Sequence, residues 1–380
     1  MDRTFKAIVL AGVHHWLDSR LEETVARPLV PIVNRPLIEH LLRWLKDGGI
    51  KSVSVCANSD TAVLQRSLGD GGAFGLRIDY YEDHMPRGPA GCARDAAQDS
   101  DFDDYLIADA TILPCAIDFA ELLAAHRRAA AAAMTVVAVS EPPAPSRKPA
   151  VEGRGPERAA LTPCLAQGLP SRLTPVGIYL INRDVFKFVS PDGYQDIKES
   201  LIPRLYQDGR RVVTHLAGAA VPRITGADSC MAANAWMLER QLRQSSPQGF
   251  RRVGEALIHD TAHLADSARL LGPVLVGPTV LGAACRADDQ AAISRSILWD
   301  YAVVERGCVL DRCILTYRAR VSSHRPHFRT VYGPPPAGLA RCLHRWLRGN
   351  PQSRCEMPSA GPCRANLPRV ALASGASAAK

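Results

Sequence analysis

The chain of 380 residues is long enough for two domains, each with its own hydrophobic core. Charged residues at 22% and apolar residues at 47% are typical of a folded soluble protein and exclude an intrinsically disordered one. Most of the net charge of +8 lies near the C-terminus, because residues 331–380 contain seven Lys or Arg residues and one Glu. The rest of the chain is close to neutral, so nucleic acid is not an expected partner.

The sequence also bears on the compartment in which the protein works. No apolar run approaches the roughly 20 residues that span a bilayer, and the N-terminus lacks the pattern of a secretory signal. We therefore predict a cytoplasmic protein. Its 11 cysteines include no CxxC pair and are expected to be reduced thiols.

The first fifty residues follow the pattern of a βαβ unit. An apolar run at residues 7–11 predicts a buried strand, and Gly12 follows it directly. After a polar loop, a helical pattern begins at Leu37 and is closed by two glycines at residues 48–49. Residues 50–56 predict the next strand. In such a unit the ligand site is expected at the carboxyl end of the first strand.

Alternating strand and helix patterns continue to about residue 240. Strands are predicted at residues 79–82, 105–108, 134–140 and 177–181, and helices at residues 119–133 and 196–208. Residues 141–174 are rich in Pro, Gly and Arg and predict a long irregular excursion. For residues 1–240 the alternation favours a Rossmann-like α/β fold, with a mostly parallel sheet and helices on both faces.

A different periodicity begins after a predicted linker at residues 241–254. Apolar residues recur at six-residue steps in two runs, which comprise Ile258, Leu264, Leu270 and Val276, and then Ile297, Val303, Val309, Leu315 and Val321. Six-residue steps are typical of parallel β-helices, in which each apolar residue stacks on its neighbour one coil away. We predict a β-helix of about three to four coils over residues 255–330.

Residues 331–380 form a basic, Pro-rich tail with a short amphipathic helical pattern at residues 339–347. The part after about residue 350 is expected to be disordered. The amphipathic segment is predicted to cap the open end of the β-helix. Its arginines lie opposite its apolar side, so docking on an anionic membrane is the alternative.

The opening of the chain resembles that of the nucleotide-sugar pyrophosphorylases, such as the mannose-1-phosphate guanylyltransferases. Their pattern runs LAGGxGTRLxPLTxxxPKPLxPVxxKPLIEH. The chain matches it in Leu10-Ala11-Gly12, in residues 28–31 and in residues 35–40. Many members carry a C-terminal left-handed β-helix with about eighteen residues per coil, which residues 297–315 resemble. The resemblance therefore implies that the predicted β-helix is left-handed.

The loop between these matches departs from the family. Residues 13–17 read VHHWL where the family has glycine, threonine and arginine, and Arg27 replaces the lysine of the PKP segment. Glycines let phosphate oxygens approach the backbone, and a β-branched residue resists the dihedral angles that this requires. We interpret the change as the loss of a loop that holds a triphosphate. A new role for His14, His15 and Trp16 in contacting phosphate or base is the alternative.

Further segments resemble the ligand-binding segments of the family. Residues 88–91, GPAG, resemble the GTAG segment that contacts the nucleotide base, and Gly177 lies in a segment that resembles NAGIY. By the same resemblance, Thr111 stands where one metal-binding Asp belongs, and Arg223 stands where the second belongs. Asp109, two residues before Thr111, is the one candidate for a metal ligand.

The resemblance thus implies a set of ligand-binding residues, two of which, Arg27 and Asp109, are also the catalytic candidates. The nucleotide-binding or sugar-binding residues that it implies are Leu10, Ala11, Gly12, Arg27, Gly88, Ala90, Gly91, Asp109, Thr111, Gly177 and Arg223.

Exchange of a metal-binding Asp for Arg223 changes the local charge by two units and disfavours Mg²⁺. We therefore predict a catalytically impaired family member that binds a nucleotide sugar or sugar phosphate without metal, through Arg27 and Arg223. It would act as a homo-oligomer or with an active relative in polysaccharide metabolism. The alternatives are an active nucleotidyltransferase that holds Mg²⁺ with Asp109, and a β-helix scaffold for assembly. Outside the active case no cofactor is expected.

Overall fold

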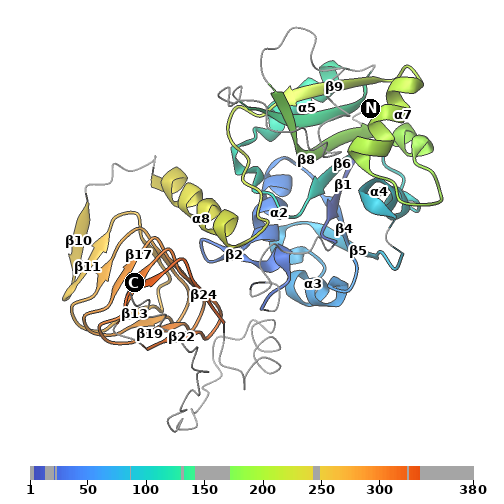
Figure 1. Cartoon of the computed structure of the whole chain (residues 1–380). Helices are drawn as coiled ribbons and strands as arrows, with labels where there is room; N and C mark the ends of the chain where they lie inside the picture. The colour runs from blue at the N-terminus through green and yellow to red at the C-terminus, as the bar shows by residue number, and fades with distance from the viewer. Residues whose placement is uncertain are drawn as a thin grey trace, which may run out of the picture.

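The computed structural model describes residues 4–12, 21, 24–85, 87–129, 132–141, 172–242, 249–322 and 325–333. An α/β domain, a helix named α8 and a β-helix follow one another along the chain (Figure 1). The predictions for residues 13–17, for most of the excursion at 141–174 and for the tail after residue 333 lie outside the described residues. Among the described residues, no helix is both long and apolar enough to cross a membrane.

The α/β domain is built on a seven-stranded sheet with the strand order β5-β4-β1-β6-β8-β7-β9. Strand β8 is antiparallel to both of its neighbours, and the other pairs are parallel, as the mostly parallel prediction requires. The strands are β1 (Phe5–Leu10), β4 (Ser52–Ala57), β5 (Arg77–Glu82), β6 (Asp104–Asp109), β7 (Ala132–Glu141), β8 (Arg172–Asn182) and β9 (Arg211–Leu216).

Helices cover both faces of this sheet. Side chains of β1 alternate between the two cores, because Ala7 and Val9 pack into one and Ile8 into the other. A strand buried on both faces reads as a continuous apolar run, which is why β1 was predictable. The first core contains α2 (Leu37–Asp47), α3 (Thr61–Leu68) and α5 (Phe119–Arg128), and the second contains α4 (Gly88–Ala97) and α7 (Ile202–Gln207).

Two predicted helices have other bounds than expected, and one helix was not predicted. Helix α5 ends at Arg128, not at residue 133, because residues from Ala132 onwards pair with β9. The predicted helix at 196–208 is divided into a π-helical turn, Ile197–Leu201, and α7. The GPAG segment was treated only as a ligand contact, but it forms the first turn of α4.

The C-terminal elements form a parallel β-helix with three faces. One face has strands β11 (Ala256–His259), β14 (Leu275–Val276), β17 (Ala292–Ser294), β20 (Val309–Asp311) and β23 (His327–Phe328). The second has β12 (His263–Leu264), β15 (Val280–Leu281), β18 (Ile297–Leu298), β21 (Ile314–Leu315) and β24 (Val331–Tyr332). The third has β13 (Arg269–Leu270), β16 (Arg286–Ala287), β19 (Val303–Val304) and β22 (Arg320–Val321).

The β-helix is longer than the predicted three to four coils, and its ends differ from the predicted 255–330. Strand β10 (Phe250–Val253) lies within the predicted linker and pairs with β11, while β24 extends beyond residue 330. Register partners lie the predicted 18 residues apart between β11 and β14, as Ile258 and Val276 do, but 17 apart in the other parallel pairs, as Val280 and Ile297 do. The left-handed sense stays a prediction of the resemblance.

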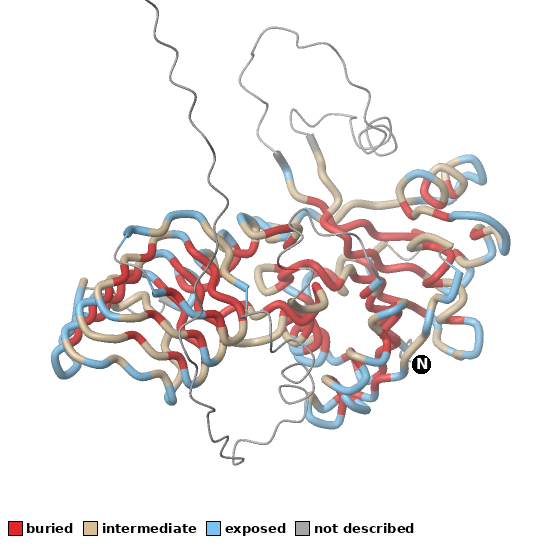
Figure 2. The backbone as a smooth tube through the Cα atoms, turned by 60° about the horizontal axis from the view of Figure 1, so that its bottom comes forward, coloured by how far each residue is buried: buried red, intermediate tan, exposed pale blue. Residues whose placement is uncertain are grey.

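A coil of 17 residues explains the phase break in the six-residue pattern. Two sides of a coil advance by six residues and the third by five, so the inward position moves by one. The core therefore contains Leu298, Val304 and Leu310, in place of the predicted Ile297, Val303 and Val309. Leu315 and Val321 are inside as predicted. Figure 2 shows the resulting alternation of buried and exposed residues along the coils.

Helix α8 (Ala227–Leu242) packs between the α/β domain and the β-helix (Figure 1). The short hairpin of β2 (Pro31–Ile32) and β3 (Arg35–Pro36) joins the same apolar cluster, which includes Trp299 of the β-helix. Asn234 of α8 accepts a hydrogen bond from the backbone N–H of Val33 at 2.8 Å. Asn34 in turn donates to the carbonyl oxygen of Leu281 at 2.7 Å, so the hairpin links both parts.

Candidate functional site

A cleft of about 540 Å³ opens where the parallel strands β1, β4 and β6 end. The chain segments that leave these strands remain hydrogen-bonded to one another. Ala11 N–H donates to Cys56 O at 2.7 Å, and Ala110 N–H donates to Leu10 O at 3.0 Å. Ligands of open α/β sheets bind at the carboxyl ends of the strands, which makes this cleft the candidate site.

The cleft brings together most of the predicted site residues, although they come from six separate segments of the chain. Those that line it are Leu10, Gly12, Arg27, Gly88, Asp109, Thr111, Gly177 and Arg223. Ala11 and Ala90 are instead buried, at 3% and 1% exposure, and a side chain on Gly91 would meet Arg87. These three residues therefore do not line the cleft, although they were predicted to bind the ligand together with the other eight.

Asp109 and Arg223 form an ion pair in the cleft. Arg223 Nη2 lies 2.9 Å from Asp109 Oδ2. The other carboxylate oxygen accepts hydrogen bonds from the backbone N–H of Thr111 at 2.8 Å and from its hydroxyl at 2.7 Å. The Arg223 side chain is 40% exposed, whereas that of Asp109 is 17% exposed. The guanidinium therefore keeps an accessible side on which an anion could bind.

The backbone brings Arg223 to this position through a short bridge with the segment after β6. Leu113 N–H donates to Pro222 O at 2.9 Å, and Ile224 N–H donates to Thr111 O at 2.8 Å. Ile112 and Arg223 are bridge partners between these bonds. Two segments far apart in the sequence are thus held in register, which fixes the Arg223 side chain beside Asp109.

Gly177 of β8 leaves the space in which this ion pair forms. Its φ of +90° is one that residues with a side chain rarely adopt. A Cβ atom at this position would lie 2.6 Å from Arg223 Nη2 and 3.2 Å from Asp109 Cβ. Glycine is therefore required for the backbone angle and for the close approach of the guanidinium.

We expect Gly177→Ala to lower the free energy of unfolding by about 1–2 kcal/mol from the backbone angle alone, and further because it displaces Arg223. Gly209→Ala is the matched control, because Gly209 has a φ of +68° and nothing within 4 Å of a Cβ atom. Urea denaturation measures both losses. Equal losses in the two variants would contradict the steric role of Gly177.

The residues at the ion pair do not fit the Mg²⁺ ion that the resemblance implies. Mg²⁺ needs oxygen ligands in near-octahedral geometry, and a guanidinium 2.9 Å from the Asp109 carboxylate opposes it. Both oxygens of Asp109 already have partners. Among the residues that the structure describes, no group of three or more His, Cys, Asp or Glu side chains is placed to hold a metal ion.

Several cleft residues were not predicted. They are Cys56, Ala57, Asn58, Asp83, Pro89, Cys92, Tyr179, Tyr194, Asp196, Ile197, Lys198, Glu199 and Thr225. Burial raises the pKa of the Asp83 carboxyl and that of the Tyr194 hydroxyl. The DIKES sequence at residues 196–200 resembles the family segment DIExD. This resemblance drew attention to these residues but did not imply that they contact a ligand. The tertiary fold alone places them at the cleft.

Arg27 is a further cation of the cleft and begins a short 3-10 helix, Arg27–Leu29. The residue is only 8% exposed, so its guanidinium is largely removed from bulk water. Electrostatic attraction to an anion is stronger in such surroundings than at an open surface. With Arg223 and Lys198, the described part of the cleft presents cations from three segments.

Comparison with known proteins agrees with this architecture. The family model described as nucleotidyl transferase matches residues 19–237, more than half of the chain. A mannose-1-phosphate guanylyltransferase of Mycobacterium tuberculosis is 26% identical over 307 residues, covering 80% of this chain and 83% of that protein. A UTP–glucose-1-phosphate uridylyltransferase of Synechocystis is 21% identical over 334 residues, covering 80% and 85%.

A glucose-1-phosphate thymidylyltransferase of Streptomyces griseus shows a higher identity over a shorter stretch. It is 33% identical over 104 residues, which cover 27% of this chain and 29% of that protein. The family match spans every strand of the sheet except β1, every lining residue of the cleft except Leu10 and Gly12, and most of α8. The chain belongs to the nucleotidyl transferase family, in the branch of nucleotide-sugar pyrophosphorylases.

Proposed function

We propose that the protein binds a nucleotide sugar in the cleft without a metal ion and with little or no turnover. The observation that carries the proposal is the Asp109–Arg223 ion pair, with its N–O distance of 2.9 Å. The resemblance implies that other family members hold a metal ion with two Asp carboxylates, at the positions that Thr111 and Arg223 occupy in this chain. Here a guanidinium compensates the one remaining carboxylate, so the ligand diphosphate would contact protein cations directly.

The polar residues of the cleft suit the parts of such a ligand. Arg27, Arg223 and Lys198 can attract phosphate oxygens, while Asp196 and Glu199 can accept hydrogen bonds from sugar hydroxyls. The Mycobacterium relative is named as a guanylyltransferase. Asp83 could receive the N1–H and N2–H donors of guanine, which uracil and thymine do not present as a pair. We therefore propose a guanine nucleotide sugar.

Calorimetric titration tests the proposal. We expect GDP-mannose to bind with similar affinity in the presence of Mg²⁺ and in the presence of a chelator. Guanosine alone should bind much more weakly, because it lacks the diphosphate. Affinity that rises steeply with Mg²⁺ would contradict a metal-free site.

The identity of the base can be tested separately. Asp83→Ala should weaken GDP-mannose binding about tenfold or more, because charge-assisted hydrogen bonds contribute about 1.5–3 kcal/mol. Binding of UDP-glucose, if measurable, should change little. Asp99→Ala is the control, since Asp99 is exposed and outside the cleft. Equal losses for both nucleotide sugars would argue against guanine recognition by Asp83.

The family match favours an active nucleotidyltransferase as the second candidate, in which Asp109 holds Mg²⁺. Members of the family typically use this ion and act on a nucleoside triphosphate and a sugar phosphate. Pyrophosphate release from GTP with mannose 1-phosphate distinguishes the candidates. Robust Mg²⁺-dependent release would favour the active enzyme.

The wider role stays at the level of proposal. A binding member of the family could regulate an active relative, or itself, through a homo-oligomer in the cytoplasm. If the chain were only a β-helix scaffold, nucleotide sugars would not raise its melting temperature. Ligands that bind the folded state do raise it, so a thermal shift separates the two roles.

A further inference from the structure

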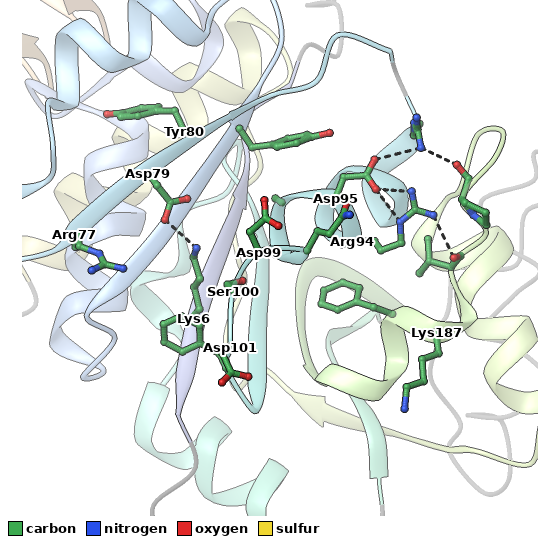
Figure 3. A pocket seen from close by; sticks show the side chains of 18 residues that line it. Lys6, Arg77, Asp79, Tyr80, Arg94, Asp95, Asp99, Ser100, Asp101 and Lys187 are labelled. Atoms are coloured by element: carbon green, nitrogen blue, oxygen red, sulfur yellow. Dashed lines mark hydrogen bonds and ion pairs between the residues drawn. The ribbon is translucent and has the colours of Figure 1, made fainter.

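A second cavity lies along α4 and has a volume of about 1050 Å³ (Figure 3). Arg87, Arg94 and Asp95 line it together with Val189 and Pro191. None of these residues lines the candidate cleft. Helix α4 nevertheless touches both cavities, because Gly88, Pro89 and Cys92 of its first turns line the cleft.

Arg94 joins α4 to the chain segment at residues 189–191. Its Nη1 donates to the carbonyl oxygens of Val189, at 3.4 Å, and of Ser190. Its Nε donates to Asp95 Oδ1 at 2.8 Å, and its Nη2 contacts the same oxygen. The side chains of Arg94 and Asp95 are 18% and 12% exposed. The arginine is thus held by its neighbour while it binds two backbone carbonyls.

Arg87, the N-cap of α4, adds a second attachment about two turns earlier. Its Nη1 donates to Pro191 O at 2.7 Å and lies 3.6 Å from Asp95 Oδ2 (Figure 3). Asp95 therefore orients both arginines. The backbone of Arg87 also takes part, since its carbonyl oxygen accepts from Gln195 N–H at 2.7 Å.

Gln195 then fixes the segment against the start of α4. Its carbonyl oxygen accepts from Ala90 N–H at 3.0 Å, and a Cβ atom on Gly88 would lie 2.6 Å from that oxygen. Its side chain is bound as well, because Arg204 Nη1 donates to Gln195 Oε1 at 2.7 Å. The backbone between Val189 and Gln195 is therefore attached to Arg87 and α4 at both of its ends.

The end of this anchored segment and the residues that follow it form one wall of the candidate cleft. They are Tyr194, Asp196, Ile197, Lys198 and Glu199. Asp196 Oδ1 accepts from the backbone N–H groups of Lys198, at 2.6 Å, and of Glu199, at 2.9 Å. The wall is thus a compact turn whose position depends on the segment before it. Tyr179 and Asp196 both line the cleft, and burial together with the nearby charge of Asp196 raises the pKa of the Tyr179 hydroxyl.

We infer that Arg94 is a positioning residue for ligand binding in the candidate cleft, acting through Asp95 and Arg87 on the wall at residues 194–199. The inference rests on the proposed function. Without Arg94, the carbonyl oxygens of Val189 and Ser190 lose a cationic donor. The Asp95 carboxylate also loses the partner that holds it in place, so it no longer orients Arg87. The wall would then sample more conformations, and ordering it on binding would cost affinity.

Arg94→Ala tests the inference. We expect GDP-mannose to bind about five- to tenfold more weakly, with faster amide hydrogen exchange at residues 194–199. Amides of β1 and β6 should exchange as in the wild type. Arg94→Lys should recover part of the affinity, because an ammonium can donate to one carbonyl but lacks the forked geometry.

Arg183→Ala is the matched control. Arg183 pairs with Asp101, which also lines the α4 cavity, but it makes no contact with residues 188–199 that the structure records. We expect its affinity to remain unchanged, with melting temperatures of the two alanine variants within about 3 °C. Wild-type affinity in Arg94→Ala, or an equal loss in Arg183→Ala, would overturn the inference. Absence of binding by the wild type would instead overturn the proposed function.

Discussion

Val304→Asp is expected to destabilise the β-helix by about 4 kcal/mol or more, whereas Val303→Asp should change its stability by less than about 1 kcal/mol. Val304 is fully buried and stacks between Ala287 and Val321 in the core. An unpaired carboxylate there would lose its hydration without gaining a partner. Denaturation followed by circular dichroism measures the two changes.

The neighbouring position provides an unusually close control. Val303 faces outward, and its register partners in the adjacent coils are Arg286 and Arg320. A carboxylate at position 303 would lie between two arginines and could gain weak surface ion pairs. If Val303→Asp were the more damaging change, the inward register of the third face would be wrong, and the strict six-residue pattern would be restored.

Arg223→Asp is expected to create a metal site in a cleft that otherwise disfavours one. The change replaces the positive partner of Asp109 with a second carboxylate, so the pair changes from neutral to a charge of about −2. Two carboxylates near one another attract a divalent ion and meet its preference for oxygen ligands. We expect Mn²⁺ affinity to rise at least about tenfold, measured by electron paramagnetic resonance of free Mn²⁺.

Two further variants separate this effect from simple removal of a cation. Arg223→Gln removes the guanidinium without adding a carboxylate and should raise Mn²⁺ affinity much less. Adding Asp109→Asn to Arg223→Asp should abolish the gain, because one of the two carboxylates is then lost. Wild-type Mn²⁺ binding as tight as that of Arg223→Asp would show that the ion pair opens readily, and would refute its role in excluding metal.

Local patterns accounted for much of the architecture. Strand β1 was evident because residues 7–10 of this strand, which is covered on both faces, are all apolar. The β-helix was evident because stacking repeats apolar residues along the chain. The register of the β-helix was not evident. Three steps of six residues make 18, whereas most coils have 17, so the inward positions drift away from a strict six-residue pattern. Helix α4 was missed because its small residues, GPAGCARDAA, resemble a loop until they are packed against a sheet.

The candidate site was predictable in its members but not in its arrangement. Motif matches indicated that Asp109 and Arg223 belonged together, and all but three of the predicted residues line the cleft. Nothing in their spacing indicated that the guanidinium would pair with the carboxylate, because that depends on the bridge between Ile112 and Arg223 and on the space beside Gly177. The wall at residues 194–199 was missed for the same reason.

By itself, the sequence determined most of the strands, several helices, their order and the change of periodicity near residue 255, because each follows from interactions between residues close along the chain. Only the tertiary structure decided which side of each coil faces the core, which groups occupy the centre of the cleft and which arginines hold its wall. Those outcomes depend on contacts between distant segments, and a difference of one residue in register or one Cβ atom at Gly177 is enough to change them.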